Sequence, residues 1–517
     1  MLLGLREMLI IALILLIFIS LLGKYFFPFI FPKTWEPLKT TGEMEEDYKR
    51  YKAEFLEYKN NFGGSINERR ERATSIPILV YHGISDYSRT QEETLVPNFK
   101  DHMFALKAAG YEAITFTDFF DFMQGKKELP DKSFLLTFDD GIKTSYYNVD
   151  PILRALDFRA VMFIITKYSL NKGTKYYLSF KEVKHMVESK RWEMQPHAKD
   201  AHNLIQVDEE GTMGHFISNK KWLKERGRLE TDEEYRQRLR NEFIDSKKEI
   251  EERLGVKAIA FAFPFGDFGQ NSINFPDALS LVVEEMKPVY SYANFYQFWP
   301  SRGFSYNHPS GESFLIKRLK VSPQWSGREL LDVLEKGKDK VLPYYDDFSK
   351  NKGWIRIWGE MVMQNNSLIL KSSDSTEGGS VFLDGTYLWK DYKYNAIVKE
   401  VGEGDTVSLI SKYQDAENYL SCEFKTEKVL IKELRNSETK ILREADVGGR
   451  YELEGGAKLS TVVKGDEIVC LINDSLILSA KSPGFAKVGG IGAKVWSQDE
   501  ESTLTIGKVE IEGISNN

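Results

Sequence analysis

The segment Ser133-Phe-Leu-Leu-Thr-Phe-Asp-Asp-Gly141 joins an apolar run to a pair of acidic residues. A short apolar run bounded by a polar turn is typical of a buried β-strand. Residues 134–138 are therefore predicted to place Asp139 and Asp140 at a strand end. Because Asp-Asp-Gly is also common in ordinary turns, the acidic pair alone does not establish a functional site.

Two histidines supply partners for such a pair. They bracket the stretch His197-Ala-Lys-Asp-Ala-His202, in a chain that has 7 histidines. A five-residue separation corresponds to roughly 500° of helical rotation, so the two rings cannot share a helix face and must converge from a loop or a strand end. One carboxylate and two imidazoles leave a zinc ion an open position, as catalytic sites do. The second carboxylate is then free to take a proton from water, and metal-assisted hydrolysis is the predicted chemistry.

Residues 76–338 alternate strand-like and helix-like stretches, which predicts a parallel sheet or barrel. Strand ends meet at one rim of a barrel, so Asp140 and both histidines are expected to meet there. The expected strands are residues 76–81, 113–116, 134–138, 160–165, 192–195 (ended by Pro196) and 258–263.

Helices are expected between these strands, over residues 100–109 and 180–189. A third helix has clear boundaries in the sequence. Thr231-Asp-Glu-Glu234 is a capping box, amphipathic residues continue to Leu254, and Gly255 supplies the stop.

The remaining segments differ in composition. Residues 1–31 are largely apolar, are interrupted by Lys24 and lack a cleavage-site pattern, which favours a retained transmembrane helix over a cleaved signal peptide. Residues 32–75 are charged and contain a heptad-like series of large apolar residues from Met44 to Phe62, which predicts a stalk helix packed on the next domain rather than a coiled-coil dimer. Residues 344–517 alternate apolar and polar residues between turn clusters, the pattern of an all-β sandwich.

Length, charge and cysteine content exclude several classes of structure and function. A chain of 517 residues is too long for one core. The net charge of −7 and the pI of 5.8 argue against a nucleic-acid partner. The 2 cysteines, Cys422 and Cys470, exclude a cysteine zinc cluster; we expect two buried thiols, with a disulfide as the alternative.

Four motifs in order give residues 76–338 a resemblance to a known family, the polysaccharide deacetylases of the nodulation-factor type (carbohydrate esterase family 4). They are Leu79-Val-Tyr-His82, Thr137-Phe-Asp-Asp-Gly141, the pair His197 and His202, and Phe263-Pro-Phe-Gly266. The match is nearest to the branch that acts on exported poly-N-acetylglucosamine. The resemblance implies a distorted (β/α)7 barrel and removal of N-acetyl groups from glucosamine polymers.

The resemblance also implies roles for individual residues. Asp139 would be the general base, while Asp140, His197 and His202 would hold a divalent metal ion, zinc by expectation. The backbone N–H of Phe265 would help to hold the oxyanion, with Phe263, Pro264 and His82 lining the substrate site.

Some family positions differ in this chain. Ala198 replaces the usual Ser or Thr, Pro196 stands where the nearest branch has Ser, and Ala262 stands where many members have an Arg that steadies the catalytic Asp. The late Leu-x-His of many members has no counterpart, and the corresponding stretch is Lys317-Arg-Leu-Lys-Val321. His308 and His82 are therefore the candidate general acids.

Aromatic residues between positions 290 and 299 fit either a sugar-stacking rim or core packing. The C-terminal region resembles concanavalin-like jelly rolls, in Ser411 to Tyr419 and Gly489 to Ala493, which implies a glycan-binding role. A spacer or a platform for a partner stays open, because fold alone does not settle function.

The sequence thus predicts a membrane-anchored, single-pass, extracytoplasmic metal-dependent deacetylase of an N-acetylglucosamine-containing polysaccharide. Two alternatives stay open: an inactive polysaccharide-binding protein that uses the barrel cleft and sandwich, and a metal amidase acting on peptidoglycan or another amide.

Overall fold

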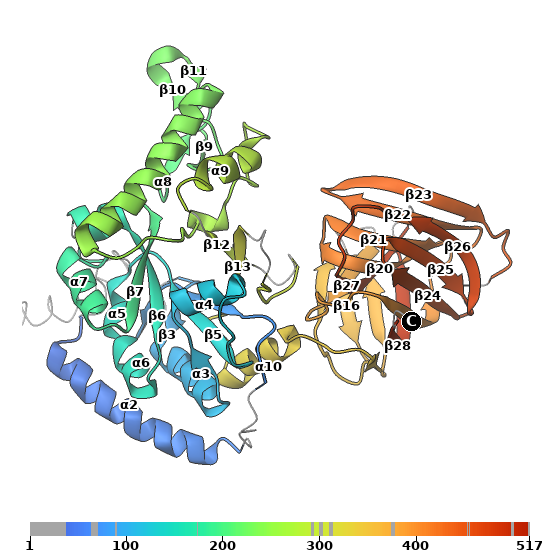
Figure 1. Cartoon of the computed structure of the whole chain (residues 1–517), viewed down its shortest axis with the longest axis horizontal. Coiled ribbons are helices and arrows are strands. Elements are labelled where there is room, and N and C mark those ends of the chain that lie inside the picture. Colours follow the sequence, from blue (N-terminus) through green and yellow to red (C-terminus); the bar gives the residue numbers. More distant parts are fainter. Residues whose placement is uncertain are drawn as a thin grey trace, which may run out of the picture. The chain divides into compact units, whose positions relative to one another are not determined.

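The computed structural model describes residues 38–63, 71–87, 90–172, 174–290, 294–298 (backbone only), 303–309, 314–373, 378–451, 453, 455–497 and 501–514. The chain divides into two compact units (Figure 1). The first comprises Met1–Gln297 and Pro309–Leu330, and the second comprises Phe298–His308 and Leu331–Asn517. The short segment 298–308 thus belongs with the C-terminal unit although the sequence places it in the first domain.

The first unit is built on a parallel sheet. Its strands lie in the order β12-β13-β1-β5-β6-β7, with β4 beside β5, and β13, β1, β5, β6 and β7 pair in parallel. The predicted α/β architecture is confirmed. The strands are β1 (Ile78–Tyr81), β4 (Glu112–Ala113), β5 (Ser133–Phe138), β6 (Ala160–Ile165), β7 (Trp192–Ala198), β12 (Asn294–Phe298) and β13 (Leu315–Lys320).

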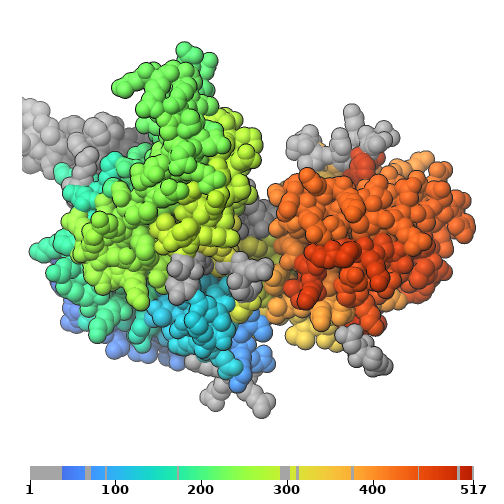
Figure 2. Space-filling view, turned by 45° about the horizontal axis from the view of Figure 1, so that its top comes forward, coloured from blue at the N-terminus to red at the C-terminus, as the bar shows by residue number. Residues whose placement is uncertain are grey.

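Helices α3, α6 and α7 flank this sheet (Figure 1). The helices of the unit and its boundary are α2 (Thr41–Asn61), α3 (Val96–Ala108), α4 (Phe116–Met123), α5 (Lys143–Tyr147), α6 (Asp150–Leu156), the π-helix Lys167–Lys172, α7 (Phe180–Glu188), α8 (Asp232–Leu254), α9 (Ala278–Met286) and α10 (Gly327–Gly337). Three short two-stranded sheets are formed by β2 (Ile84–Ser85) with β3 (Thr94–Leu95), β8 (Leu204–Gln206) with β9 (Met213–His215), and β10 (Trp222–Leu223) with β11 (Arg228–Leu229). The β10–β11 pair projects beyond the N-terminal end of α8 and forms the green protrusion at the top of Figure 2.

Helix α2 packs against the rest of the first unit, as the sequence predicted. Tyr51 is buried, and the rings of Phe55 and Tyr58 meet Phe104 of α3 at 5.3 and 5.5 Å. Tyr58 also donates to Asp101. The heptad-like series is therefore the face by which this helix covers the barrel.

Helix α8 begins and ends where its sequence signals lie. Thr231 accepts from the backbone of Glu234 and the Glu234 side chain returns to the backbone of Thr231, while Gly255 ends the helix with φ of 70°. Capping at both ends satisfies backbone groups that would otherwise lack hydrogen-bond partners. The two ends of α8 are therefore fixed by its own sequence.

The expected strand 258–263 does not form a regular ladder. The backbone N–H groups of Ile259 and Ala260 donate instead to the side-chain oxygen of Gln195 on β7, and the Gln195 amide donates to the Lys257 carbonyl. A side chain thus replaces the backbone partner, so the segment lies beside β7 without being a strand.

Two further expectations were wrong in detail. In the predicted strand 113–116, Thr115 instead caps α4, with its side chain accepting from the Asp118 backbone. Pro196 does not end its strand: it lies within β7, beside a register shift between Ile164 and Ile165. Prolines in strands are usually found at such irregular positions, and His197 is consequently a strand residue.

The second unit is a sandwich of two antiparallel sheets, which confirms the predicted all-β region. The first sheet has the order β16-β17-β28-β19-β24-β25-β26 with β14 beside β28, and the second has the order β15-β18-β27-β20-β21-β22-β23. The strands are β14 (Tyr344–Asp346), β15 (Trp354–Trp358), β16 (Glu360–Met363), β17 (Leu368–Lys371), β18 (Gly378–Leu383), β19 (Tyr392–Val401), β20 (Thr406–Asp415), β21 (Asn418–Phe424), β22 (Lys428–Arg435), β23 (Glu438–Asp446), β24 (Ala457–Lys464), β25 (Glu467–Ile472), β26 (Ser475–Lys481), β27 (Gly490–Trp496) and β28 (Thr503–Gly513).

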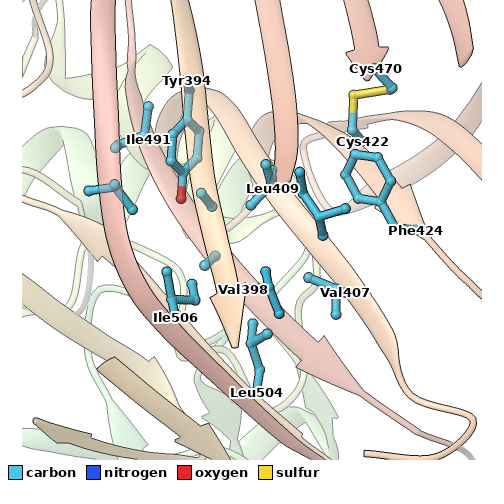
Figure 3. Close-up of a cluster of buried hydrophobic side chains, with 14 of the residues drawn as sticks. Tyr394, Val398, Val407, Leu409, Cys422, Phe424, Cys470, Ile491, Leu504 and Ile506 are labelled. Atoms are coloured by element: carbon cyan, nitrogen blue, oxygen red, sulfur yellow. A yellow bond between two sulfur atoms is a disulfide. The ribbon is translucent and has the colours of Figure 1, made fainter. Parts of the chain in front are cut away.

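The core of the sandwich contains a disulfide (Figure 3). Cys422 on β21 and Cys470 on β25 are bonded to each other, and both are fully buried in the main hydrophobic cluster. The expectation of two free thiols was wrong. Strand alternation predicts only that each side chain faces the core, and their pairing depends on which strands of the two sheets lie opposite each other.

The predicted transmembrane helix, residues 1–31, lies outside the described residues. Within the part of the chain that the structure describes, no helix has the length and apolar character needed to cross a membrane.

Candidate active site

The acidic pair lies at the end of a fully buried strand. Every residue of β5 is buried, and the backbone N–H of Asp139 donates to the Tyr81 carbonyl at the end of β1. Asp140 then adopts φ of 70°, a left-handed conformation that is unusual for a non-glycine residue and is often found at functional sites. Gly141 has φ of 71°, and a Cβ there would lie 2.9 Å from the Ser169 hydroxyl. The tight turn holds the two carboxylates at the rim.

Three predicted ligands converge at this point. Asp140 Oδ1 lies 3.3 Å from His197 Nε2 and 3.2 Å from His202 Nε2, and one ligand atom from each residue lies within 4.8 Å of the others. The three residues come from the end of β5, the end of β7 and the turn that follows β7. Parallel strands bring Asp140 to the two histidines although more than fifty residues separate it from them in the chain.

Local hydrogen bonds favour a metal ion rather than a proton at this centre. His197 Nδ1 lies 2.9 Å from the Ala262 carbonyl, which assigns the proton to Nδ1 and leaves the Nε2 lone pair directed towards Asp140. Asp140 Oδ1 is buried and has no hydrogen-bond partner among the described atoms. Carboxylate and imidazole lone pairs that face one another without an intervening donor are the arrangement a divalent cation satisfies.

Asp139 is held by an arginine that sequence reasoning missed. Arg318 on β13 donates from Nη1 to Asp139 Oδ1 at 2.7 Å and from Nη2 to Oδ2 at 2.8 Å. Arg318 is completely buried. The pair is a two-bond fork that fixes both the position and the plane of the carboxylate. Arg318 lies in the stretch 317–321, which the sequence comparison had singled out only for its missing histidine.

These contacts set the charges of the acidic pair. Burial raises the pKa of Asp139, but the charge and hydrogen bonds of Arg318, together with the charges of His197 and His82, outweigh it and the pKa lies below its usual range. Burial also raises the pKa of Asp140, yet the two imidazoles hold it well below the usual range. Burial lowers the pKa of His202, and the opposing effect of Asp140 leaves it raised. Protons therefore compete with a cation for the histidine side of the cluster.

The Phe263 to Gly266 stretch forms a strained turn beside the cluster. Phe263 and Pro264 are buried, whereas Phe265 is 46% exposed and has φ of 60°. The Phe265 ring lies 4.9 Å from the His202 ring and stacks on His215 at 4.6 Å. The turn thus brings Phe265 next to a proposed ligand.

His215 was also absent from the sequence-based predictions. Its Nδ1 lies 2.6 Å from the buried carboxylate of Asp267, which also accepts from the Gly269 backbone. The only sequence signal was the presence of a polar residue directly after the Phe263–Gly266 motif.

The two candidate acids occupy different environments. His82 follows β1, is partly exposed, and its charge contributes to lowering the pKa values of Asp139 and Asp140. His308 belongs to the second unit, where its Nε2 pairs with Asp339 at 2.8 Å and its ring meets Tyr387. The structure therefore associates His82 with the acidic pair.

For the aromatic residues between positions 290 and 299, which fit either a sugar-stacking rim or core packing, the structure shows core packing at Tyr290. Tyr290 is 1% exposed and packs in the core near Phe243. The other side chains of that stretch lie outside the described residues.

Comparison with known proteins agrees with this geometry. Residues 126–281 match the sequence model of a family described as polysaccharide deacetylase. This range includes Asp139, Asp140, His197, His202 and the Phe263–Gly266 turn. This part of the chain is therefore similar to the polysaccharide deacetylase family, whose members are hydrolases that cleave amide bonds.

Curated relatives share part of this domain. The chain is similar to a poly-β-1,6-N-acetyl-D-glucosamine N-deacetylase of Escherichia coli K12, with 24% identity over 225 residues, 41% of this chain and 32% of that protein. It is also similar to a protein of the same name from Staphylococcus aureus MSSA476, with 31% identity over 157 residues, 29% of this chain and 52% of that protein. The chain thus spans about a third and about half of the lengths of these relatives.

Among solved structures, a de-N-acetylase from Aggregatibacter actinomycetemcomitans has 21% identity and a TM-score of 0.41, covering 49% of this chain and 97% of that chain.

Proposed function

We propose that this protein is a metal-dependent deacetylase that removes N-acetyl groups from a polysaccharide containing N-acetylglucosamine. The observation that carries the proposal is the convergence of Asp140, His197 and His202 beside the Arg318-bound carboxylate of Asp139. Three protein ligands and a separate ionised base are the parts that hydrolysis of an unreactive amide requires. The named activity of the curated relatives supports the choice of substrate.

Asp140, His197 and His202 would hold the metal ion, zinc by expectation, which would supply a Lewis acid to polarise an amide carbonyl and acidify water. Asp139 takes a proton from the water that attacks the acetyl carbon, and Arg318 keeps its carboxylate ionised and correctly oriented. The backbone N–H of Phe265 stabilises the negative charge that develops on the carbonyl oxygen. The C–N bond then breaks to release acetate and a free amine on the sugar.

The leaving nitrogen needs a proton when the C–N bond breaks. We assign this role to His82, because it lies at the end of β1 and interacts electrostatically with both aspartates. A histidine at a strand end on the same rim can deliver a proton without any movement of the sheet.

The decisive experiment combines zinc titration with acetate release from β-1,6-linked N-acetylglucosamine oligomers. Wild-type protein should bind one zinc ion and release acetate. The Asp139→Asn variant should retain zinc but lose about 10²–10⁴-fold in kcat, while Asp140→Asn should lose zinc itself. If wild type and Asp139→Asn bind polysaccharide and are equally inert, the polysaccharide-binding alternative is correct. Faster release from peptidoglycan or a non-sugar amide would instead favour the amidase alternative.

We further propose that the chain is anchored in a membrane by residues 1–31 with both units outside the cytoplasm. The apolar N-terminal sequence supports the anchor, and the buried Cys422–Cys470 disulfide supports an oxidising compartment. Protease treatment of intact cells should degrade both units. Protection from protease in intact cells, with degradation only after lysis, would refute this location.

For the sandwich we propose glycan binding on the outer face of its second sheet. Strand alternation directs Trp358, Lys494 and Trp496 away from the core, and the Lys494 ammonium lies 5.6 and 5.8 Å from the two indole rings. The Trp496 Nε1 and the nearby Ser408 hydroxyl are buried without a hydrogen-bond partner among the described atoms.

Indole rings on an outward sheet face are the kind of surface on which a sugar ring stacks. The double substitution Trp358→Ala and Trp496→Ala should weaken binding of the full chain to polysaccharide without changing acetate release from short oligomers. Unchanged polysaccharide binding would leave the sandwich as a spacer.

A further inference from the structure

The turn that joins the two histidine ligands is held by a carboxylate from a distant helix. Glu242 of α8 accepts from three consecutive backbone N–H groups: Lys199 at 2.6 Å, Asp200 at 3.0 and 3.2 Å, and Ala201 at 3.2 Å. These residues lie between His197 and His202. Glu242 is 4% exposed, and the hydrogen bonds recorded for its side chain all go to this turn.

Burying a carboxylate is costly unless its hydrogen bonds replace those of water. Here the three backbone N–H groups donate the hydrogen bonds that water would otherwise supply to the carboxylate. The carboxylate in turn provides each of these N–H groups with an acceptor. Hydrogen bonds to a charged acceptor are stronger than neutral ones. A buried anion that is satisfied by one particular turn restrains the backbone of that turn strongly.

The other ion pairs of the turn are more exposed. The Asp200 carboxylate pairs with Lys167, and these two side chains are 42% and 40% exposed. The Lys199 ammonium pairs with Asp245 at 2.8 Å and Glu249 at 3.3 Å, one and two helical turns further along α8. Asp245 is 48% exposed in its side chain, and exposed ion pairs contribute little to stability. Glu242 is therefore the contact that fixes the turn, and Asp245 provides a matched control on the same helix and the same turn.

We infer that Glu242 is a positioning residue that sets the spacing of His197 and His202 before a metal ion binds. His197 is already oriented by the Ala262 carbonyl, whereas His202 follows the restrained turn directly. Loss of the three hydrogen bonds would let the turn relax and move His202 away from Asp140. The inference rests on the proposed metal-dependent function, and it adds a structural role for α8 in that function.

The first test measures the equilibrium zinc affinity of Glu242→Gln and Asp245→Asn by competition with a chelating dye. Removing a group that orients a metal ligand typically costs about 10–100-fold in affinity, and Glu242→Gln should fall in this range. Asp245→Asn should stay within about twofold, as expected for an exposed pair. A purely structural role for Glu242 would lower the urea midpoint of the metal-free protein but leave the zinc affinity of the folded protein unchanged, and this result would overturn the inference.

The second test does not require a variant to fold. Amide hydrogen exchange in the metal-free wild-type protein should show slow exchange at Lys199, Asp200 and Ala201. Exchange at the intrinsic rate in the metal-free protein, with protection only after zinc is added, would refute preorganisation by Glu242. If wild-type protein binds no zinc at all, the proposed function fails, yet slow exchange at these amides would still establish that Glu242 holds the turn.

Discussion

Replacing Arg318 with methionine would leave the Asp139 carboxylate buried without its cation. The side chain is completely buried and makes two hydrogen bonds of 2.7 and 2.8 Å to the carboxylate. Hydrogen bonds to charged groups contribute about 1.5–3 kcal/mol each, and removal of one partner of a buried ion pair costs about 3–5 kcal/mol. The two hydrogen bonds together give about 3–6 kcal/mol and the ion pair gives about 3–5 kcal/mol. The metal-free variant should therefore lose about 3–5 kcal/mol of unfolding free energy at pH 7, the range that both share.

The pH dependence of this loss has a definite sign. In the wild-type protein the pKa of Asp139 is lowered, so its ionised form stabilises the fold above the ordinary aspartate pKa, and this contribution is lost as pH falls through the lowered value. In Arg318→Met the lowering effects of the arginine are lost while burial still acts, so the pKa of Asp139 should rise. The variant should therefore recover stability relative to wild type as the pH is lowered and the carboxylate is protonated.

Two assays check this reasoning. Urea unfolding of the metal-free proteins at pH 7 and pH 5 should show a smaller difference between variant and wild type at the lower pH. The acid limb of kcat/KM against pH should move to higher pH in Arg318→Met, because the base loses its proton later. Arg318→Lys should lie between the two, since a lysine keeps the charge but not the two-bond fork. A difference in stability that is equal at both pH values, together with an unmoved acid limb, would refute the assigned role of Arg318.

Three other substitutions test separate parts of the structure. His82→Asn should lower kcat by about 10²–10⁴-fold because the general acid is lost, whereas His308→Asn should leave acetate release near the wild-type rate. A large loss in His308→Asn with little loss in His82→Asn would assign the role of general acid to His308. Phe265→Gly keeps the backbone N–H and suits the positive φ, so kcat should change little. Phe265→Pro removes the N–H donor and should lower kcat by about 10²–10³-fold. Equal losses of kcat in the two variants would argue against a role for the backbone N–H. Replacing Cys422 and Cys470 by alanine opens a loop with a sequence separation of 48 and should destabilise the sandwich by roughly 4 kcal/mol. Urea unfolding measures this loss, and an unchanged urea midpoint would contradict the role of the disulfide.

Several elements were predictable because their signals are local. The apolar run of β5 and the acidic turn after it are adjacent in sequence, so pattern alone places Asp139 and Asp140 at a strand end. The same holds for α8, whose capping box and terminal glycine lie within the helix boundaries themselves. The alternation of strands and helices was enough to predict a parallel sheet, and parallel sheets bring strand ends to one edge.

Other features depend on which elements become neighbours in space. Arg318 reaches Asp139 across 179 residues because β13 pairs with β1 beside β5, and no local pattern distinguishes it from any other charged residue on a strand. Pro196 was expected to end β7, but its carbonyl accepts from Ala262 on an adjoining segment, so tertiary contacts outweighed a local preference.

The sequence alone determined most of the elements and the residues able to hold a metal ion, since periodicity and residue chemistry act over a few positions. Only the tertiary structure decided which charges face one another: Arg318 on Asp139, Glu242 on the histidine turn, and Cys422 on Cys470. Such pairings depend on strand order and on the packing of helices against the sheet, which arise from the summed burial of many side chains rather than from any one segment.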